Sequence, residues 1–396
     1  MLLTWALRVL GLTMIAFSSD FARANDIDQS DGPEPVGRMT GDCGVALAAL
    51  TAVGQAPEPV GRMTGDCGLA VTFSLDGNRL LTKGVETAQV WDAQTFKAIG
   101  QPLRHTKRVY SACFGWDGAK VFTAGDEGFI RVSGAATAKE LTAPWRHGKE
   151  IEMASFSLDG ARIVTVGYDH LAKVWDTSTG RVLITLQHER RVFFAAFSAN
   201  GSRLLTTSEL GWAHLWDVAT AKELISPIQC DEDGAAISPD GKRLAVVLPL
   251  RGGVGIYDAA NGAQICKAPW AFGQLGSITF SPDGTMVLVA AQDCCRVLDA
   301  ATGKPRTANL INDTARANAA VFSRDGKRVA VAADWWQSGV WDVATGHRVW
   351  SAGKHIAVAH AIALSPDGNR VAVGGWQWDD SEPTDPETRV WTLPAR

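Results

Sequence analysis

Short apolar runs separated by turn-forming residues fill most of the chain. Between positions 152 and 186, four runs are rich in Val, Ile, Leu and Thr: Glu152–Phe156, Ala161–Val166, Leu171–Trp175 and Arg181–Leu186. Gly, Asp and Ser separate them, and Asp-Gly pairs supply the positive φ that tight hairpins need. This pattern predicts four short strands. One such sheet cannot bury both of its faces alone, so it needs neighbours of the same kind.

The same unit recurs along the chain. An apolar residue followed by Ser-x-Asp-Gly, or a close variant, occurs eight times at intervals of 40 to 43 residues. The copies begin at Phe73, Phe114, Phe156, Phe197, Ile237, Phe280, Phe322 and Leu364. A second motif, Trp-Asp or a degenerate form, follows each copy: Trp91-Asp92, Val132-Ser133, Trp175-Asp176, Trp216-Asp217, Tyr257-Asp258, Leu298-Asp299, Trp341-Asp342 and Trp391-Thr392. Two motifs in phase predict a repeat architecture.

These units resemble WD40 repeats, and the resemblance covers about residues 57–396. It implies an all-β fold, an eight-bladed β-propeller of four-stranded antiparallel blades, with a seven-bladed ring as the alternative. In the third unit, His147, Thr165, Asp169 and Trp175 match the family's intra-blade hydrogen-bonded tetrad. Such a set lets four buried polar groups satisfy one another.

Other units keep parts of the tetrad. The second keeps His105 and Thr123 but has Ser133 in place of the tryptophan. The fourth keeps His188, Thr206 and Trp216, with Glu209 near the acidic position. The fifth and sixth lose most of it, so we expect those blades to depend more on apolar packing.

The eighth unit has no outer strand of its own after Trp391, and an unpaired edge favours aggregation. Residues 57–64 stand where outer strands stand in other units, so we expect this closing strand to pair with the last blade. Its sequence belongs to a duplication, because PEPVGRMTGDCG occurs at both 33–44 and 57–68. Residues 25–56, which hold the first copy, are expected to be a poorly ordered leader.

Residues 1–24 have the features of a secretory signal peptide. Arg8 supplies positive charge, Val9–Phe17 is an apolar run, and Ala22-Arg23-Ala24 is a small-x-small cleavage site. We therefore expect an exported protein of bacterial type, periplasmic or extracellular. A cytoplasmic protein is the alternative if this segment is not cleaved.

Charge, hydropathy and motif content argue against several classes of function. The net charge of −4 gives no basic field that would hold nucleic acid. No other stretch is long and apolar enough for a membrane span, so none is expected after signal cleavage. The seven cysteines contain no CxxC pair. P-loop, HExxH, GxSxG and EF-hand motifs are missing from the sequence, so we expect no catalytic residues, no metal and no cofactor.

The remaining candidate binding residues are tryptophans in loops. Five stand in or beside expected loops between second and third strands: Trp212, Trp335, Trp336, Trp376 and Trp378. Tryptophan is enriched at binding hot spots. We expect a monomeric, non-enzymatic scaffold that binds partner proteins through these residues on one face. The alternatives are a propeller enzyme, lactonase- or hydrolase-like, with a metal in the central channel, and a cytosolic signalling scaffold.

Overall fold

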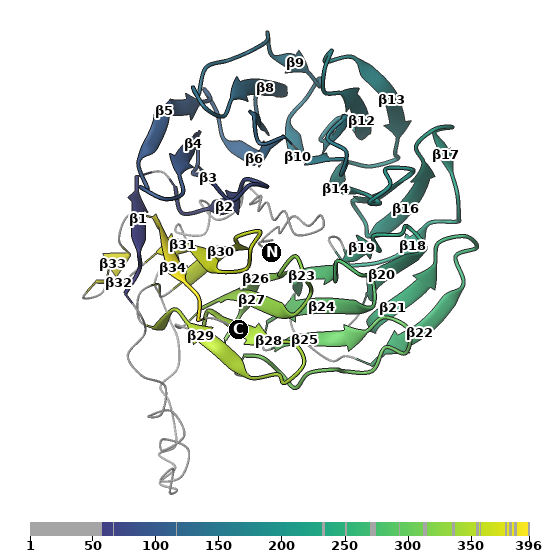
Figure 1. The fold of residues 1–396 in the computed structure, drawn as a ribbon. Coiled ribbons are helices and arrows are strands. Elements are labelled where there is room, and N and C mark those ends of the chain that lie inside the picture. Colours follow the sequence, from purple (N-terminus) through teal and green to yellow (C-terminus); the bar gives the residue numbers. More distant parts are fainter. Residues whose placement is uncertain are drawn as a thin grey trace, which may run out of the picture.

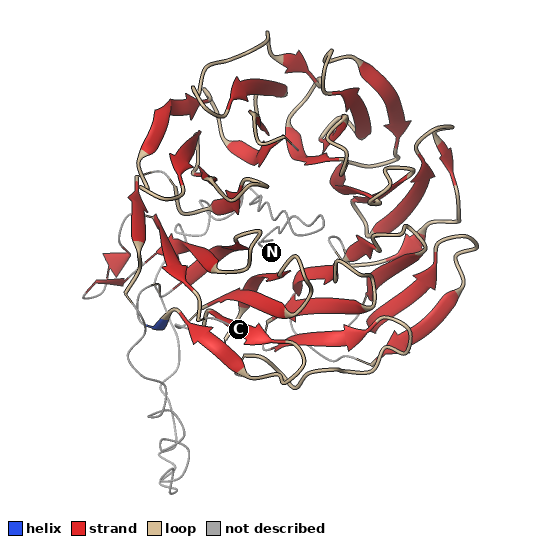
Figure 2. Cartoon of the chain, viewed as in Figure 1, coloured by secondary structure: helices blue, strands red, loops and turns tan. Residues whose placement is uncertain are grey.

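The computed structural model describes residues 58–65, 67–115, 117–231, 234–249, 252–269, 275–292, 294–311, 315–334, 337–353, 356, 358–376, 378–379, 382–383 and 386–394, with backbone alone at 275–276 and 378–383. The expected signal peptide, and the leader at 25–56, lie outside these residues. The described part is built from strands, arranged as small sheets around a ring (Figures 1 and 2). It contains no helix with the length and hydropathy needed to span a bilayer.

The first four blades follow one another in sequence. Blade 1 contains β2 (Ala70–Phe73), β3 (Arg79–Lys83), β4 (Thr87–Asp92) and β5 (Ala98–Arg104). Blade 2 contains β6 (Val109–Phe114), β7 (Lys120–Gly125), β8 (Phe129–Gly134) and β9 (Trp145–Arg146). Blade 3 contains β10 (Ile151–Phe156), β11 (Arg162–Gly167), β12 (Leu171–Asp176) and β13 (Val182–Gln187). Blade 4 contains β14 (Val192–Phe197), β15 (Arg203–Ser208), β16 (Trp212–Asp217), β17 (Lys222–Glu223) and β18 (Ile228–Gln229).

The other four complete the circle. Blade 5 contains β19 (Ala235–Ile237), β20 (Arg243–Leu248), β21 (Gly253–Asp258) and β22 (Gln264–Ala268). Blade 6 contains β23 (Leu275–Phe280), β24 (Met286–Ala291) and β25 (Cys294–Asp299). Blade 7 contains β26 (Ala317–Phe322), β27 (Arg328–Ala333), β28 (Gly339–Asp342) and β29 (Arg348–Ser351). Blade 8 contains β30 (Val358–Leu364), β31 (Arg370–Trp376), β34 (Glu387–Thr392) and β1 (Gly61–Thr64), while β32 (Trp378–Asp379) and β33 (Glu382–Pro383) form a separate hairpin.

The all-β, eight-bladed propeller is therefore confirmed, and the seven-bladed alternative is wrong. In blade 3 each observed strand begins and ends within one residue of the run expected from sequence. Agreement is close there because Gly and Asp turns bound each run.

The ring closes through the segment before the first repeat. Strand β1 pairs antiparallel with β34, with Gly61 opposite Val390 and Thr64 opposite Glu387. The segment that precedes blade 1 in the sequence thus supplies the outer strand of blade 8 (Figure 1). This arrangement leaves β34 paired on both sides.

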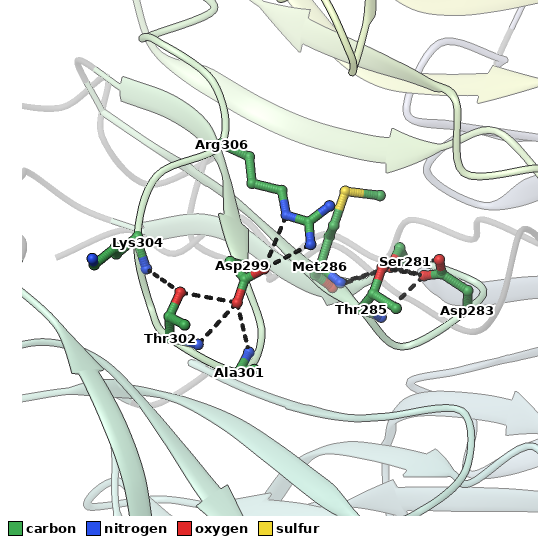
Figure 3. Close-up of polar contacts among 9 residues, drawn as sticks. All are labelled: Ser281, Asp283, Thr285, Met286, Asp299, Ala301, Thr302, Lys304 and Arg306. Atoms are coloured by element: carbon green, nitrogen blue, oxygen red, sulfur yellow. Dashed lines mark hydrogen bonds and ion pairs between the residues drawn. The ribbon is translucent and has the colours of Figure 1, made fainter.

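Repeated polar turns fix the ends of the strands. In blade 6, Ser281 Oγ donates to Asp283 Oδ1 at 2.5 Å and accepts from the Met286 amide at 2.9 Å (Figure 3). At the turn that follows β25 in the same blade, Asp299 accepts the Thr302 amide and, through Oδ2, the Arg306 guanidinium (Figure 3). Arg306 and Thr302 together hold the pKa of Asp299 at about 2. The Ser-x-Asp-Gly repeat is therefore a turn motif whose polar side chains satisfy the local backbone.

Two outer strands are irregular. In blade 6 the fourth position is filled by an extended segment without a regular ladder: Arg306 N donates to Val297 O and Leu310 N to Cys295 O, both at 2.8 Å. Pro305, which lacks an amide hydrogen, stands where the ladder would begin. In blade 4 the outer strand is split into β17 and β18, with Pro227 just before β18.

Apolar side chains from adjacent blades form the core. The cluster at ring closure contains Met63 of β1 together with Trp350 and Trp391, whose ring centroids lie 5.2 Å apart. Arginines add polar links on the turn side. Arg79, Arg203 and Arg328 each donate to the carbonyl oxygen of the Gly in the following blade's first turn: Gly118 at 3.3 Å, Gly241 at 2.6 Å and Gly368 at 3.2 Å.

Candidate functional site

Strand order decides which loops share a face of the ring. The strands of each blade are antiparallel, so loops from the second to the third strand emerge at the same end as connections from one blade to the next. We call this end the loop face. The Ser-x-Asp-Gly and Trp-Asp turns emerge at the opposite end. All five candidate tryptophans belong by sequence to loops or strand ends of the loop face.

Blade 3 brings its four expected tetrad residues together below this face. Trp175 Nε1 donates to Thr165 Oγ1 at 2.7 Å, and Thr165 Oγ1 lies 2.8 Å from His147 Nδ1. His147 Nε2 lies 3.0 Å from Asp169 Oδ1, and the contact with His147 lowers the pKa of the Asp169 carboxyl. With Asp169 accepting from Nε2, Nδ1 is free to accept the Thr165 hydroxyl proton. The four groups form one chain of hydrogen bonds.

In blade 2 a glutamate, Glu127, stands in place of the aspartate of the tetrad, and the sequence analysis did not identify it. His105 Nε2 lies 2.7 Å from Thr123 Oγ1, and His105 Nδ1 lies 3.5 Å from Glu127 Oε2. Arg131 Nη2 holds the same carboxylate at 2.9 Å. Contacts with Thr106 and Arg131 lower the pKa of Glu127 to about 2, whereas burial lowers that of His105 to about 4. Glu127 stands two positions after Gly125, as Asp169 does after Gly167, which is the signal that would have identified it.

In blade 4 the expected acidic partner is wrong. His188 Nε2 and Trp216 Nε1 both lie 2.9 Å from Thr206 Oγ1, but Glu209 pairs with Arg191, with Nε 3.7 Å from Oε1. The second nitrogen of His188 is buried without a hydrogen-bond partner. Burial and the neighbouring His214 lower the pKa of His188 to about 3.

The loop between β15 and β16 of blade 4 presents an exposed apolar tip. Leu210 is 63% exposed and Trp212 is 40% exposed. Leu210 has a φ of +73°, a conformation that is uncommon and costly for a branched side chain. Beside them, the Arg191 guanidinium lies 5.2 Å from the centroid of Tyr168 and 4.5 Å from that of Phe193. These five residues form what we call the blade 4 tip.

Blade 8 carries a second aromatic group, which is packed inward. The Trp376 ring meets the buried His360 ring edge-on, with centroids 4.5 Å apart. Burial lowers the pKa of His360 to about 4. In the adjoining blade 7, Asn318 Nδ2 donates to Asp334 Oδ1 at 2.7 Å and to Ala359 O at 2.9 Å, and burial raises the pKa of Asp334.

His360 and Asn318 share a backbone feature that the sequence did not reveal. In six blades the inner strand shifts register at one equivalent position, a β-bulge: Tyr110, Glu152, Phe193, Gly276, Asn318 and His360. The five side chains other than glycine are all buried. In five blades the bulge therefore carries a buried side chain near the loop face.

The ring separates the candidate tryptophans. Trp212 begins β16 in blade 4 and Trp376 ends β31 in blade 8, on opposite sides of the circle (Figure 1). Trp378 begins the short hairpin strand β32 that follows. Trp335 and Trp336 lie outside the described residues; in the sequence they stand between β27 and β28 of blade 7. Among the described candidates, Trp212 is therefore separated from Trp376 and Trp378 by the width of the ring.

The described residues show no arrangement of groups that would hold a metal ion. Among the residues that the structure describes, no three His, Cys, Asp or Glu side chains approach closely enough to hold a metal ion. The Thr165 and His147 side chains are at most 1% exposed and are bonded to each other. Their geometry suits a structural role.

Comparisons with known proteins agree with this geometry. The family model "WD domain, G-beta repeat" matches residues 142–176 and 180–217, which include the tetrad positions of blades 3 and 4. No curated protein sequence matches the chain. A solved structure of the computationally designed Ika8 protein has a TM-score of 0.70 and 21% identity, covering 83% of this chain and 97% of that one. That likeness shows the fold alone.

Proposed function

We propose that this chain is a non-enzymatic interaction scaffold built on a WD40 propeller, which binds a partner protein through its loop face. The exposure of Leu210 and Trp212 at the blade 4 tip supports this proposal more than any other observation. Two large apolar side chains stand in water in the blade that holds the hydrogen-bonded residues His188, Thr206 and Trp216. Binding residues are commonly carried on loops that a rigid scaffold positions.

The chemistry of the blade 4 tip fits a protein partner. Tryptophan and arginine are the residues most enriched at interaction hot spots, and both are present. Arg191 is held against two aromatic rings and Glu209, so little side-chain entropy would be lost when it binds. Leu210 combines a strained, positive φ with a largely exposed side chain, and backbone strain of this kind is often found at functional residues.

Trp335, Trp336, Trp376 and Trp378 supply the second contact region in this proposal. Because Trp376 lies across the ring from Trp212, a partner that touches both regions must cover the mouth of the ring (Figure 1). A smaller partner would use one region. The protein itself acts as a monomer in this proposal, with no cofactor.

Export is a separate part of the proposal. Residues 1–24 act as a signal peptide and the mature chain begins at Asn25 in a bacterial periplasm or outside the cell. N-terminal sequencing of the protein purified from its host tests this. A chain that starts at Met1 would favour the cytoplasmic alternative.

Cross-linking in the native compartment tests partner binding. We expect the wild-type chain to capture a specific protein, and the L210A/W212A variant to lose most of it. A variant with alanine at Trp335, Trp336, Trp376 and Trp378 tests the second region. The matched control is V182A/L183A, which removes comparable exposed apolar side chains from the outer strand of blade 3. Equal recovery by all variants with unchanged thermal unfolding would disprove loop-face binding.

A further inference from the structure

The position of β1, the strand that closes the ring, accepts only certain residues. We call it the closing site: the edge of β34, together with Pro386 and Phe96. Residues 61–64 pair along β34, and the Val60 amide donates to Val390 O at 2.8 Å. Met63 is 1% exposed and belongs to the core cluster that contains Trp391. A strand seated here needs a large apolar residue at the position of Met63.

Three glycines are also required. A Cβ on Gly61 would lie 2.3 Å from the Phe96 ring, and one on Gly68 would lie 2.5 Å from Pro386 Cβ. Gly65 has a φ of +108°, which strongly favours glycine. The closing site therefore accepts a sequence with glycine at these three positions.

Polar contacts complete the fit. Thr388 Oγ1 donates to the carbonyl oxygen of Cys67 at 2.6 Å, and Cys67 Sγ donates to Met63 O at 3.1 Å. Cys67 is almost fully buried. A small side chain with a hydrogen-bond donor is therefore needed at that position.

The chain contains a second segment that meets every one of these requirements. Residues 33–44 are identical to 57–68, so Gly37, Met39, Gly41, Cys43 and Gly44 repeat the residues that the closing site selects. The two copies first differ at Val45 and Leu69, just beyond the residues that contact β34. The two copies would make the same contacts with β34.

We propose that residues 33–44 are an alternative closing strand that exchanges with 57–68 on the edge of β34. In the exchanged state the chain runs from Gly44 through a released loop, residues 45–69, and rejoins the fold at Ala70. Loop-closure entropy grows slowly with length, so the released loop disfavours this state only modestly. The exchange releases the second copy, residues 57–68, from the edge of β34. This device is independent of partner binding at the loop face.

Copy-specific substitutions in the full chain test the proposal. M63D places a charge in the closing site when 57–68 is seated, M39D alters only the first copy, and M39D/M63D disables both. We expect M39D to leave the midpoint of thermal unfolding unchanged, M63D to lower it by a few degrees, and the double variant to lower it by about 10 °C or more. If M63D alone lowers the midpoint as much as the double variant, the first copy does not replace the second and the proposal is wrong.

Disulfide trapping identifies which copy is seated. Met63 lies opposite Thr388, so M63C with T388C should form an intrachain disulfide and serves as the positive control. In a C43S/C67S background, we expect M39C with T388C to form the bond as well, and to a greater extent when M63D is added. No bond from M39C even with M63D present would overturn the exchange. A bond between two chains, seen as a dimer on a non-reducing gel, would overturn exchange within one chain.

Discussion

Arg370 Nη2 donates to the carbonyl oxygen of Gly77 at 2.7 Å, and so links the last blade to the first across 293 positions of sequence. Its Nη1 atom donates to the carbonyl oxygen of Ala93 in the same blade. The guanidinium carbon also lies 5.4 Å from the centroid of the Phe73 ring. The first and last repeats are therefore joined on the turn side of the ring by one side chain, and near the outer edge by β1.

Loss of this arginine should weaken the ring measurably. In R370M the alkyl stem remains, but two half-buried carbonyl oxygens lose a charged donor and Phe73 loses its cation. We expect a loss of about 2 kcal/mol in the free energy of unfolding, measured by urea denaturation. R203M is the matched control, because Arg203 makes one bond of the same kind, to Gly241, between blades 4 and 5. It should cost about half as much, and an equal or larger cost would show that ring closure does not depend specially on Arg370.

Thr165 is the member of the blade 3 tetrad whose loss should cost most. Its hydroxyl contacts both Trp175 Nε1 and His147 Nδ1, so T165V leaves two buried polar atoms without partners. We expect T165V to reduce the free energy of unfolding by about 2–4 kcal/mol. T123V in blade 2 should cost less, since Ser133 stands in place of the tryptophan and one partner, His105, is affected. Chemical denaturation of both variants measures the difference, and the opposite order would contradict the role given to Trp175.

Much of the architecture was predictable because it depends on local chemistry. The Ser-x-Asp-Gly and Trp-Asp turns recur at a fixed period, and each satisfies its own backbone within a few residues, as at Ser281 and Asp299. The blade 3 tetrad was identifiable for the same reason, since His147 and Trp175 stand at fixed distances from these turns. The arginine links were missed although the signal is visible: arginine recurs five residues after the turn serine at Arg79, Arg162, Arg203, Arg243, Arg328 and Arg370.

Features that depend on geometry across the ring were not predictable. Loop position alone placed Trp212 and Trp376 on one face, but blade number puts them on opposite sides of the circle (Figure 1). The inner-strand bulges depend on how six strands meet around the axis, and residues as different as Phe193, Asn318 and His360 occupy them. Glu209 was expected near His188, yet the neighbouring Arg191 attracts its carboxylate.

Acid should destabilise the folded protein in a defined range. Burial lowers the pKa of His105 and His360 to about 4 and that of His188 to about 3. The unfolded chain binds a proton at each histidine below about pH 6.5, while the folded chain does so only near these lower values. The stability that these groups confer is therefore complete above about pH 6.5 and is lost as the pH falls toward 4, by about 1.4 kcal/mol per pH unit for each histidine.

Urea denaturation at several pH values between 7 and 4.5 measures this slope. H188Q keeps an amide that can bond to Thr206 and removes one titrating group, so its slope should be smaller by about one proton. The readout is the slope, which a general loss of stability at all pH values would not change. A slope for H188Q equal to that of the wild-type protein would show that His188 does not titrate in this range.

Because Leu210 has a strained backbone conformation, its replacement should change stability and partner affinity in opposite directions. Leu210 adopts a φ of +73° that glycine tolerates freely, so L210G should raise the free energy of unfolding by about 0.5–1 kcal/mol. The same change removes a largely exposed apolar side chain beside Trp212, so affinity for the partner should fall about tenfold or more. H170G is the control, because His170 in blade 3 has a φ of +64° and stands at the position of Gly211, which directly follows Leu210, in the corresponding loop. It should stabilise the fold to a similar extent and leave partner affinity unchanged. If L210G stabilises the protein and binds the partner as tightly as the wild type, the strained leucine does not serve recognition and the blade 4 tip loses its main support.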